Sequence, residues 1–134
     1  MFLNSLDSKD YPIAQLGERV LRSLANPVKD FNGPQLHKVV EEMFEQLNIA
    51  GGVGIAAPQI RHSLQVMIIA SKPNERYPSA PDMEPLLLIN PQIVSASEIK
   101  IKDWEGCLSI PGIRALVPRS IEVDVEYQDM SGNK

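Results

Sequence analysis

The sequence predicts an α+β fold, and two observations carry that prediction. Apolar residues recur with helical spacing over residues 33–52, which indicates a helix with one buried face. Beyond residue 64 the pattern changes to short runs rich in Val and Ile, which indicate strands. The chain has 134 residues and 43% hydrophobic content, which suits one domain, residues 1–134, with a single core of ordinary size.

The helix over residues 33–52 has an apolar stripe and a signal at each end. Pro34 suits the first helical turn, and the pair Gly51 and Gly52 suits the end. One lysine and three glutamates face away from the stripe, which consists of Leu36, Val39, Val40, Met43, Phe44 and Leu47. The preceding residues 17–34 contain proline and an Asn-Gly pair, so we expect extended or turning chain there.

Three later segments, residues 65–71, 86–96 and 120–129, have the composition of strands. Apolar and polar residues alternate in the last of them, which predicts a strand with one solvated face. Residues 72–85 are rich in proline, and we expect an exposed loop there; a linker between domains is the alternative. Residues 128–134 have hairpin-turn chemistry with no returning strand after them, so we expect the domain to be C-terminally truncated.

Charge and composition exclude several classes of protein. With 13 basic residues against 17 acidic ones, the net charge is −4 and the basic residues are scattered, so we expect no nucleic-acid partner. The sequence shows neither a secretion signal nor an apolar run long enough for a membrane span, so we expect a cytoplasmic protein without membrane contact. One cysteine cannot form an internal disulfide, which leaves its thiol for packing, catalysis or a metal.

Two short stretches hold the candidate functional residues. The first, GGVGIAAPQI at residues 51–60, has so little side-chain bulk that a ligand or another backbone could approach its main chain closely. A helix end followed by a tightly packed turn explains the same glycines. The second, EGCLSIPG at residues 105–112, contains Cys107, and a single cysteine is more often a small buried hydrophobic residue than a functional group.

Taken together, the stretches carry a family resemblance. GVGIAAPQ and EGCLS, in this order, separated by LLLINP and followed by RALVPR, closely resemble the motifs of peptide deformylases. Those enzymes are metal-dependent hydrolases that remove the formyl group from the initiating methionine of new bacterial-type proteins. The resemblance implies antiparallel sheets packed with the N-terminal-half amphipathic helix, and N-formylmethionyl peptides of nascent chains as substrates.

The resemblance also implies roles for seven residues. Cys107 would be a thiolate ligand of the metal, and Gln59 with the backbone N–H of Leu108 would hold the developing oxyanion. Val53, Gly54 and Gly106 would line the peptide-binding groove, and Arg114 would lie near the far end of the substrate. One divalent metal is implied, Fe²⁺ by resemblance, with Ni²⁺ or Zn²⁺ possible in preparations.

The family's third motif, an HExxH helix that supplies two histidines and a glutamate, does not occur in the sequence. We therefore expect this chain to lack the central C-terminal helix, and with it the metal ligands that would secure the ion. The two histidines, His37 and His62, are expected at the edge of the helix's polar face and in a basic turn, both near solvent.

Three readings follow. In the first, the chain is the larger part of a deformylase whose remaining ligands come from elsewhere. In the second, it is a catalytically inactive fragment or pseudoenzyme that keeps a peptide groove without metal. In the third, Cys107 is a thiol nucleophile, which would require a histidine base within reach. Because removal of a central helix would leave an apolar groove open, we also expect self-association.

Overall fold

The computed structural model describes residues 12–134, and its elements follow one another in two groups. The first group consists of the 3-10 turn η2 (Arg19–Leu21), the helix α1 (Pro34–Ala50), the strand β1 (Gly54–Ala56), the 3-10 turn η3 (Ala57–Ile60) and the strand β2 (Val66–Ile69). The second group consists of the strands β3 (Leu86–Ala96), β4 (Lys100–Cys107), β5 (Ile110–Ser120) and β6 (Val123–Gln128). One α-helix and antiparallel strands make an α+β fold, as predicted.

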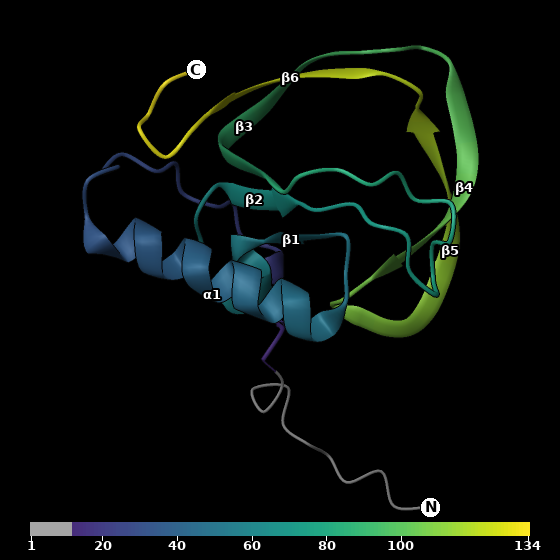
Figure 1. Cartoon of the computed structure of the whole chain (residues 1–134), viewed down its shortest axis with the longest axis horizontal. Coiled ribbons are helices and arrows are strands. Elements are labelled where there is room, and N and C mark those ends of the chain that lie inside the picture. The colour runs from purple at the N-terminus through teal and green to yellow at the C-terminus, as the bar shows by residue number, and fades with distance from the viewer. Residues whose placement is uncertain (1–11) are drawn as a thin grey trace, which may run out of the picture.

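The strands form two antiparallel sheets. The larger sheet has the order β1-β2-β3-β6, and the smaller one is the β4-β5 hairpin. Figure 1 shows α1 lying alongside β1 and β2, while β3 and β6 run across the opposite side and the long hairpin curves along one flank. Within residues 12–134, no helix combines the length and the apolar character that crossing a bilayer requires.

The helix α1 begins and ends where the sequence predicts. The Asp30 carboxylate accepts hydrogen bonds from the N–H groups of Asn32 and Gly33 at 3.0 Å each, which sets the turn into the helix. Gly51 ends the helix in the left-handed conformation, with φ 64°, and its N–H donates to the Leu47 carbonyl at 3.0 Å. The predicted stripe is the buried face, apart from Phe44, which is half-buried.

The core lies between α1 and one face of the larger sheet. Ile55, Ile68 and Leu87 are neighbours across β1, β2 and β3, because Ile68 pairs with each of the other two. Ile55 and Ile68 are buried, and they join the apolar stripe of the helix in one cluster. The cluster therefore anchors the end of α1 and the start of β1, which is where the Gly-rich stretch begins.

The strands beyond this core are far more exposed. β6 pairs with β3 and forms the edge of the larger sheet, with Val123 52% exposed. In the hairpin, Trp104 is 55% exposed and Ile113 is 62% exposed. The prediction of one solvated face for residues 120–129 is therefore incomplete. The apolar side chains on the other face are exposed or half-buried as well.

Candidate functional site

The two motif stretches meet although about fifty residues separate them in sequence. Gln59 lies in η3, directly after β1, and Cys107 is the last residue of β4. The Gln59 side-chain nitrogen Nε2 is 3.9 Å from Cys107 Sγ. The thiol is free and exposed. The fold therefore places an amide donor beside an accessible sulfur.

The Gln59 amide has a defined orientation. Its Oε1 accepts a 2.9 Å hydrogen bond from the backbone N–H of Ala56. Because a backbone N–H can only donate, the atom facing it is the oxygen, and Nε2 faces the other way. There Nε2 donates to the hydroxyl of Ser109 at 3.1 Å. The side chain is thus held at both ends of its amide group.

A cavity of about 140 Å³ lies between the two stretches. Six of the seven residues singled out from the sequence line it. The full lining consists of Gly52, Val53, Gly54, Gln59, Arg76, Tyr77, Gly106, Cys107 and Leu108. The seventh, Arg114, lines two neighbouring cavities that share Tyr77 and Gly106 with the first. The structure therefore brings the sequence-predicted residues together around one region.

Two glycines in this region are tightly packed. A Cβ on Gly52 would lie 3.0 Å from Leu108 Cδ1, so Leu108 rests on the bare backbone at the end of α1. A Cβ on Gly54 would lie 3.1 Å from the backbone oxygen of Ile68 in the adjacent strand β2. Since β1 is an edge strand, its outer side is open to another extended chain.

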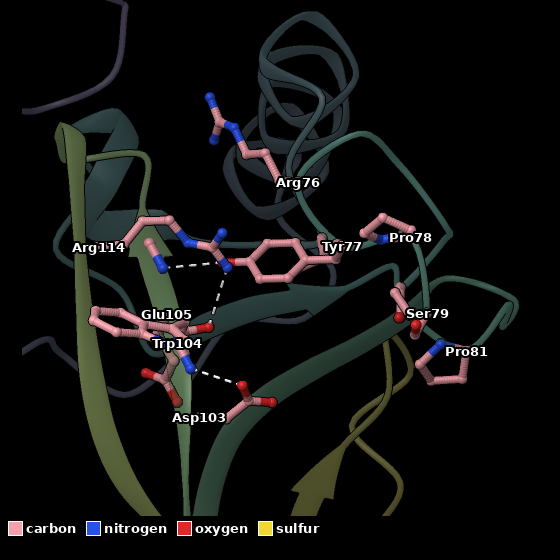
Figure 2. Close-up of a pocket in the computed structure, with 13 residues that line it drawn as sticks. Arg76, Tyr77, Pro78, Ser79, Pro81, Asp103, Trp104, Glu105 and Arg114 are labelled. Carbon is pink, nitrogen blue, oxygen red and sulfur yellow. Dashed lines mark hydrogen bonds between the residues drawn. The ribbon is translucent and has the colours of Figure 1, made fainter.

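The larger neighbouring cavity, of about 650 Å³, lies between the 72–85 loop and β4. Figure 2 shows the Tyr77 ring and the Arg114 side chain pointing toward one another across it. The Arg114 guanidinium carbon lies 5.2 Å from the centre of the Tyr77 ring, within range of a cation–π contact. Arg114 Nη2 also donates to the Trp104 carbonyl at 3.4 Å. Arg114 is therefore held at the cavity's wall.

Sequence reasoning missed two residues at this site, Tyr77 and Ser109. The Tyr77 hydroxyl accepts a 2.9 Å hydrogen bond from the N–H of Gly106, although Tyr77 belongs to the loop that was expected to be merely exposed. No local pattern in the proline-rich loop indicates that contact. For Ser109, the signal available was its place within EGCLS, directly after Leu108.

One carboxylate beside the site, that of Glu105, is paired with an arginine. Arg119 donates from Nε and Nη2 to the two carboxylate oxygens of Glu105, at 2.8 Å each. The Arg119 hydrogen bond, aided by its positive charge, holds the pKa of Glu105 below its usual range, and the same pair raises the pKa of Arg119. The Glu105 carboxylate, next to Gly106, is therefore engaged in an ion pair with Arg119 of the same hairpin.

The resemblance implies a metal ion with Cys107 as one of its ligands. Among residues 12–134, no group of three or more His, Cys, Asp or Glu side chains is arranged to hold a metal ion. His37 is exposed, and His62 Nε2 lies 3.1 Å from Glu42 Oε2. These residues by themselves do not complete a metal site, and Cys107 can supply one ligand at most.

Comparisons with known proteins agree with this arrangement. The model of the family described as polypeptide deformylase matches residues 10–134. The chain is 47% identical to peptide deformylase 2 of Nostoc sp. over 91% of its own length and 68% of that protein's. It is 46% identical to peptide deformylase 2 of Shewanella oneidensis over 93% of its length and 68% of that protein's.

Solved structures show the same similarity. The class I type b peptide deformylase of Acinetobacter baumannii, with Met-Ala-Ser bound, superposes with a TM-score of 0.87 and 40% identity over 91% of this chain and 78% of that one. The peptide deformylase of Thermotoga maritima gives a TM-score of 0.78 and 33% identity over 92% of this chain and 76% of that one. Since the family model covers both motifs and the relatives match nearly the whole chain, this chain belongs to the polypeptide deformylase family.

Proposed function

We propose that this chain acts as a metal-dependent hydrolase that removes the N-formyl group from the N-terminal methionine of newly made proteins. The reaction breaks the amide bond between the formyl carbon and the methionine nitrogen, adds one water molecule and releases formate and a free amino terminus. The observation that carries the proposal is the placement of the Gln59 amide against Cys107 and Leu108 around one cavity.

The substrate peptide would lie between β1 and the end of β4. Val53, Gly54 and Gly106 line the cavity from its two sides, and glycines there leave the backbone open to another extended chain. Arg114, at the adjoining cavity, would contact the far end of the peptide. Support for a peptide ligand comes from the similar Acinetobacter baumannii enzyme, whose structure holds Met-Ala-Ser.

The Gln59 side chain and the Leu108 backbone N–H would stabilise the oxyanion that develops when the formyl carbon is attacked. The Gln59 amide is already oriented by Ala56 and Ser109, so little reorganisation would be needed as charge develops. Fixed donors of this kind typically lower a barrier by about 3 kcal/mol each. These two groups would therefore contribute mainly to kcat.

Cys107 would bind the metal through its thiolate, because its sulfur is exposed beside the cavity. The family is metal-dependent, and such a metal supplies hydroxide from a bound water at neutral pH. We propose Fe²⁺, with Ni²⁺ or Zn²⁺ able to replace it in preparations. Since residues 12–134 hold no group of three such ligands, the other ligands would come from outside these residues.

The partners follow from the same reasoning. The proposed partners are formylmethionyl peptides of nascent chains in the cytoplasm, and the net charge of −4 gives no support for nucleic acid. Self-association is also proposed, because large apolar side chains of β3 to β6 are exposed, among them Ile93, Ile101 and Ile113. Sedimentation of a single monomeric species at about 50 µM, together with high thermal stability, would contradict self-association.

The test is hydrolysis of formyl-Met-Ala-Ser by the protein that contains this chain and the remaining metal ligands, purified without oxygen and supplied with Fe²⁺ or Ni²⁺. Formate release that disappears in Cys107→Ala and persists in the control Ser23→Ala is the expected result. Ser23 is a suitable control because its hydroxyl only donates to the Arg19 carbonyl on the surface. Full activity of Cys107→Ala would refute the assignment of the thiol. Binding of formyl-Met-Ala-Ser without hydrolysis would leave only a peptide-binding role.

A further inference from the structure

We propose that Ser109 is a positioning residue that holds the Gln59 amide in the orientation needed for deformylation. The inference rests on the proposed function, because it concerns the oxyanion donor of that reaction. Ser109 would not touch the substrate. It would act through Gln59, by accepting a hydrogen bond from one of the two amide N–H bonds so that the other N–H is directed toward the reacting group.

Burial and hydrogen bonding at Ser109 support this role. Ser109 is 4% exposed and is the buried polar residue among residues 12–134. Its Oγ accepts the 3.1 Å hydrogen bond from Gln59 Nε2, while Ala56 N–H holds the other end of the amide. The Ala56 N–H decides which end of the amide is the oxygen, and the buried Ser109 hydroxyl holds the nitrogen end. Rotation of the amide away from this orientation would leave one of these two partners without its hydrogen bond.

The two amide protons then have different directions. One points to Ser109 Oγ, and the remaining one is on the side of Cys107, whose sulfur is 3.9 Å from the same nitrogen. An amide held at only its oxygen end could turn its N–H bonds away from that side. Ser109 therefore helps to hold the orientation in which the second N–H of Gln59 is directed at Cys107 Sγ.

A second connection joins the same two residues through the main chain. The N–H of Ala14 donates to the Gln59 carbonyl at 2.6 Å, and the N–H of Leu16 donates to the Ser109 carbonyl at 2.9 Å. Ala14 is fully buried, so this segment is anchored in the core at its start. Gln59 and Ser109 are thus linked both side chain to side chain and through residues 14–16, which fixes the spacing between the two motifs.

A purely structural role for Ser109 makes a different prediction. If Ser109 only fills a buried position at the hairpin turn, its replacement lowers stability, and any resulting loss of activity is the same whichever residue stands at position 59. If Ser109 positions Gln59, its replacement should cause no further loss of activity once the Gln59 amide has been removed. A double-mutant cycle separates these cases, because it measures the coupling between the two side chains.

The first experiment is that cycle, measured on the metal-loaded protein with formyl-Met-Ala-Ser. Ser109→Ala should lower kcat by about tenfold to a hundredfold with KM changed less than about twofold, and should have no further effect in a Gln59→Ala background. Ser120→Ala is the matched control, since its hydroxyl donates to the Ser97 carbonyl at the opposite end of the same hairpin. An unchanged kcat, or an equal loss in both backgrounds, would overturn the proposal.

The second experiment needs no activity. In ¹⁵N-labelled wild-type protein, the Gln59 side-chain amide protons should exchange with solvent about tenfold more slowly than those of Gln92, an exposed glutamine in β3. Exchange as fast as that of Gln92 would overturn the positioning role even if Ser109→Ala fails to fold. If the chain releases no formate with any metal while Gln59 is protected, the proposed function fails and the orientation of Gln59 by Ser109 stands.

Discussion

The backbone N–H of Gly106 donates a 2.9 Å hydrogen bond to the hydroxyl of Tyr77, so the 72–85 loop is fastened to β4 one residue before Cys107. A Cβ on Gly106 would lie 3.6 Å from that hydroxyl, which shows how closely the tyrosine follows the strand. Tyr77 also lines all three cavities around the site. The loop is therefore part of the site's wall.

Tyr77→Phe should release the Gly106 N–H while keeping the aromatic ring. A neutral hydrogen bond contributes about 1 kcal/mol net, so amide exchange at Gly106 should become about five- to tenfold faster. Hydrogen exchange followed by NMR measures this directly. Tyr127→Phe, in β6, is the matched control and should leave Gly106 unchanged. Unaltered protection of Gly106 in Tyr77→Phe would show that the hydroxyl does not hold the loop.

The Glu105–Arg119 pair predicts a pH dependence of the hairpin. Because Arg119 lowers the pKa of Glu105, the pair stabilises the folded state above the unfolded-state pKa of about 4.3. That contribution should be lost as pH falls through the lower, folded-state pKa. A ¹³C NMR titration of the Glu105 carboxyl should show the low pKa in wild type and a higher one in Arg119→Met.

Lys102→Met is the matched control for that titration. It also removes a positive charge from the hairpin, but Lys102 and Glu105 point to opposite faces because side chains alternate along a strand. The Glu105 pKa should stay low in this variant. An equal rise of the pKa in both variants would mean that general charge, not the Arg119 contact, is the cause.

Gly54→Ala should destabilise the protein more than Gly52→Ala. The new Cβ at position 54 would meet the Ile68 backbone oxygen at 3.1 Å, and a strand carbonyl cannot move aside. At position 52 the neighbour at 3.0 Å is a methyl group of the flexible Leu108 side chain. Overpacking typically costs about 1–3 kcal/mol, and Gly54→Ala should show such a loss in urea unfolding. Equal losses would show that β1 can shift relative to β2.

Asn90 joins three parts of the chain from a left-handed backbone conformation with φ 50°. Its side chain accepts from the Val28 N–H at 2.7 Å and donates to the Val28 carbonyl at 2.9 Å and to Gln128 Oε1 at 2.8 Å. Losing these bonds in Asn90→Ala should cost about 2–4 kcal/mol of unfolding free energy.

Asn90→Gly separates the side-chain bonds from the backbone strain. Glycine adopts a positive φ freely, so this variant should lose the hydrogen bonds but spare about 1 kcal/mol relative to Asn90→Ala. Unfolding in urea measures both free energies. If both variants were as stable as the wild type, the Asn90 bonds would not contribute to the fold.

Local pattern was sufficient for some elements and insufficient for others. The spacing of Leu36 and its stripe predicts α1, and residues 86–96 coincide with β3. The β4-β5 hairpin was not predicted as such, because Lys100–Cys107 mixes charged, aromatic and glycine residues and β5 contains two prolines. Its strands form because each supplies the other's backbone hydrogen bonds, which is a pairing and not a property of either strand alone.

The sequence by itself determined the α+β class, the ends of α1 and the family, because helical spacing, glycine stops and short motifs are local and survive without knowledge of contacts. The tertiary structure alone decided that Gln59 meets Ser109, that Tyr77 meets Gly106 and that Cys107 is exposed beside both. These contacts join residues 29 to 50 positions apart, and they depend on how β1, η3 and the hairpin pack around one core. No local spacing predicts such contacts, since the sequence pattern around each residue is compatible with its own strand, turn or loop whether or not the partner is present.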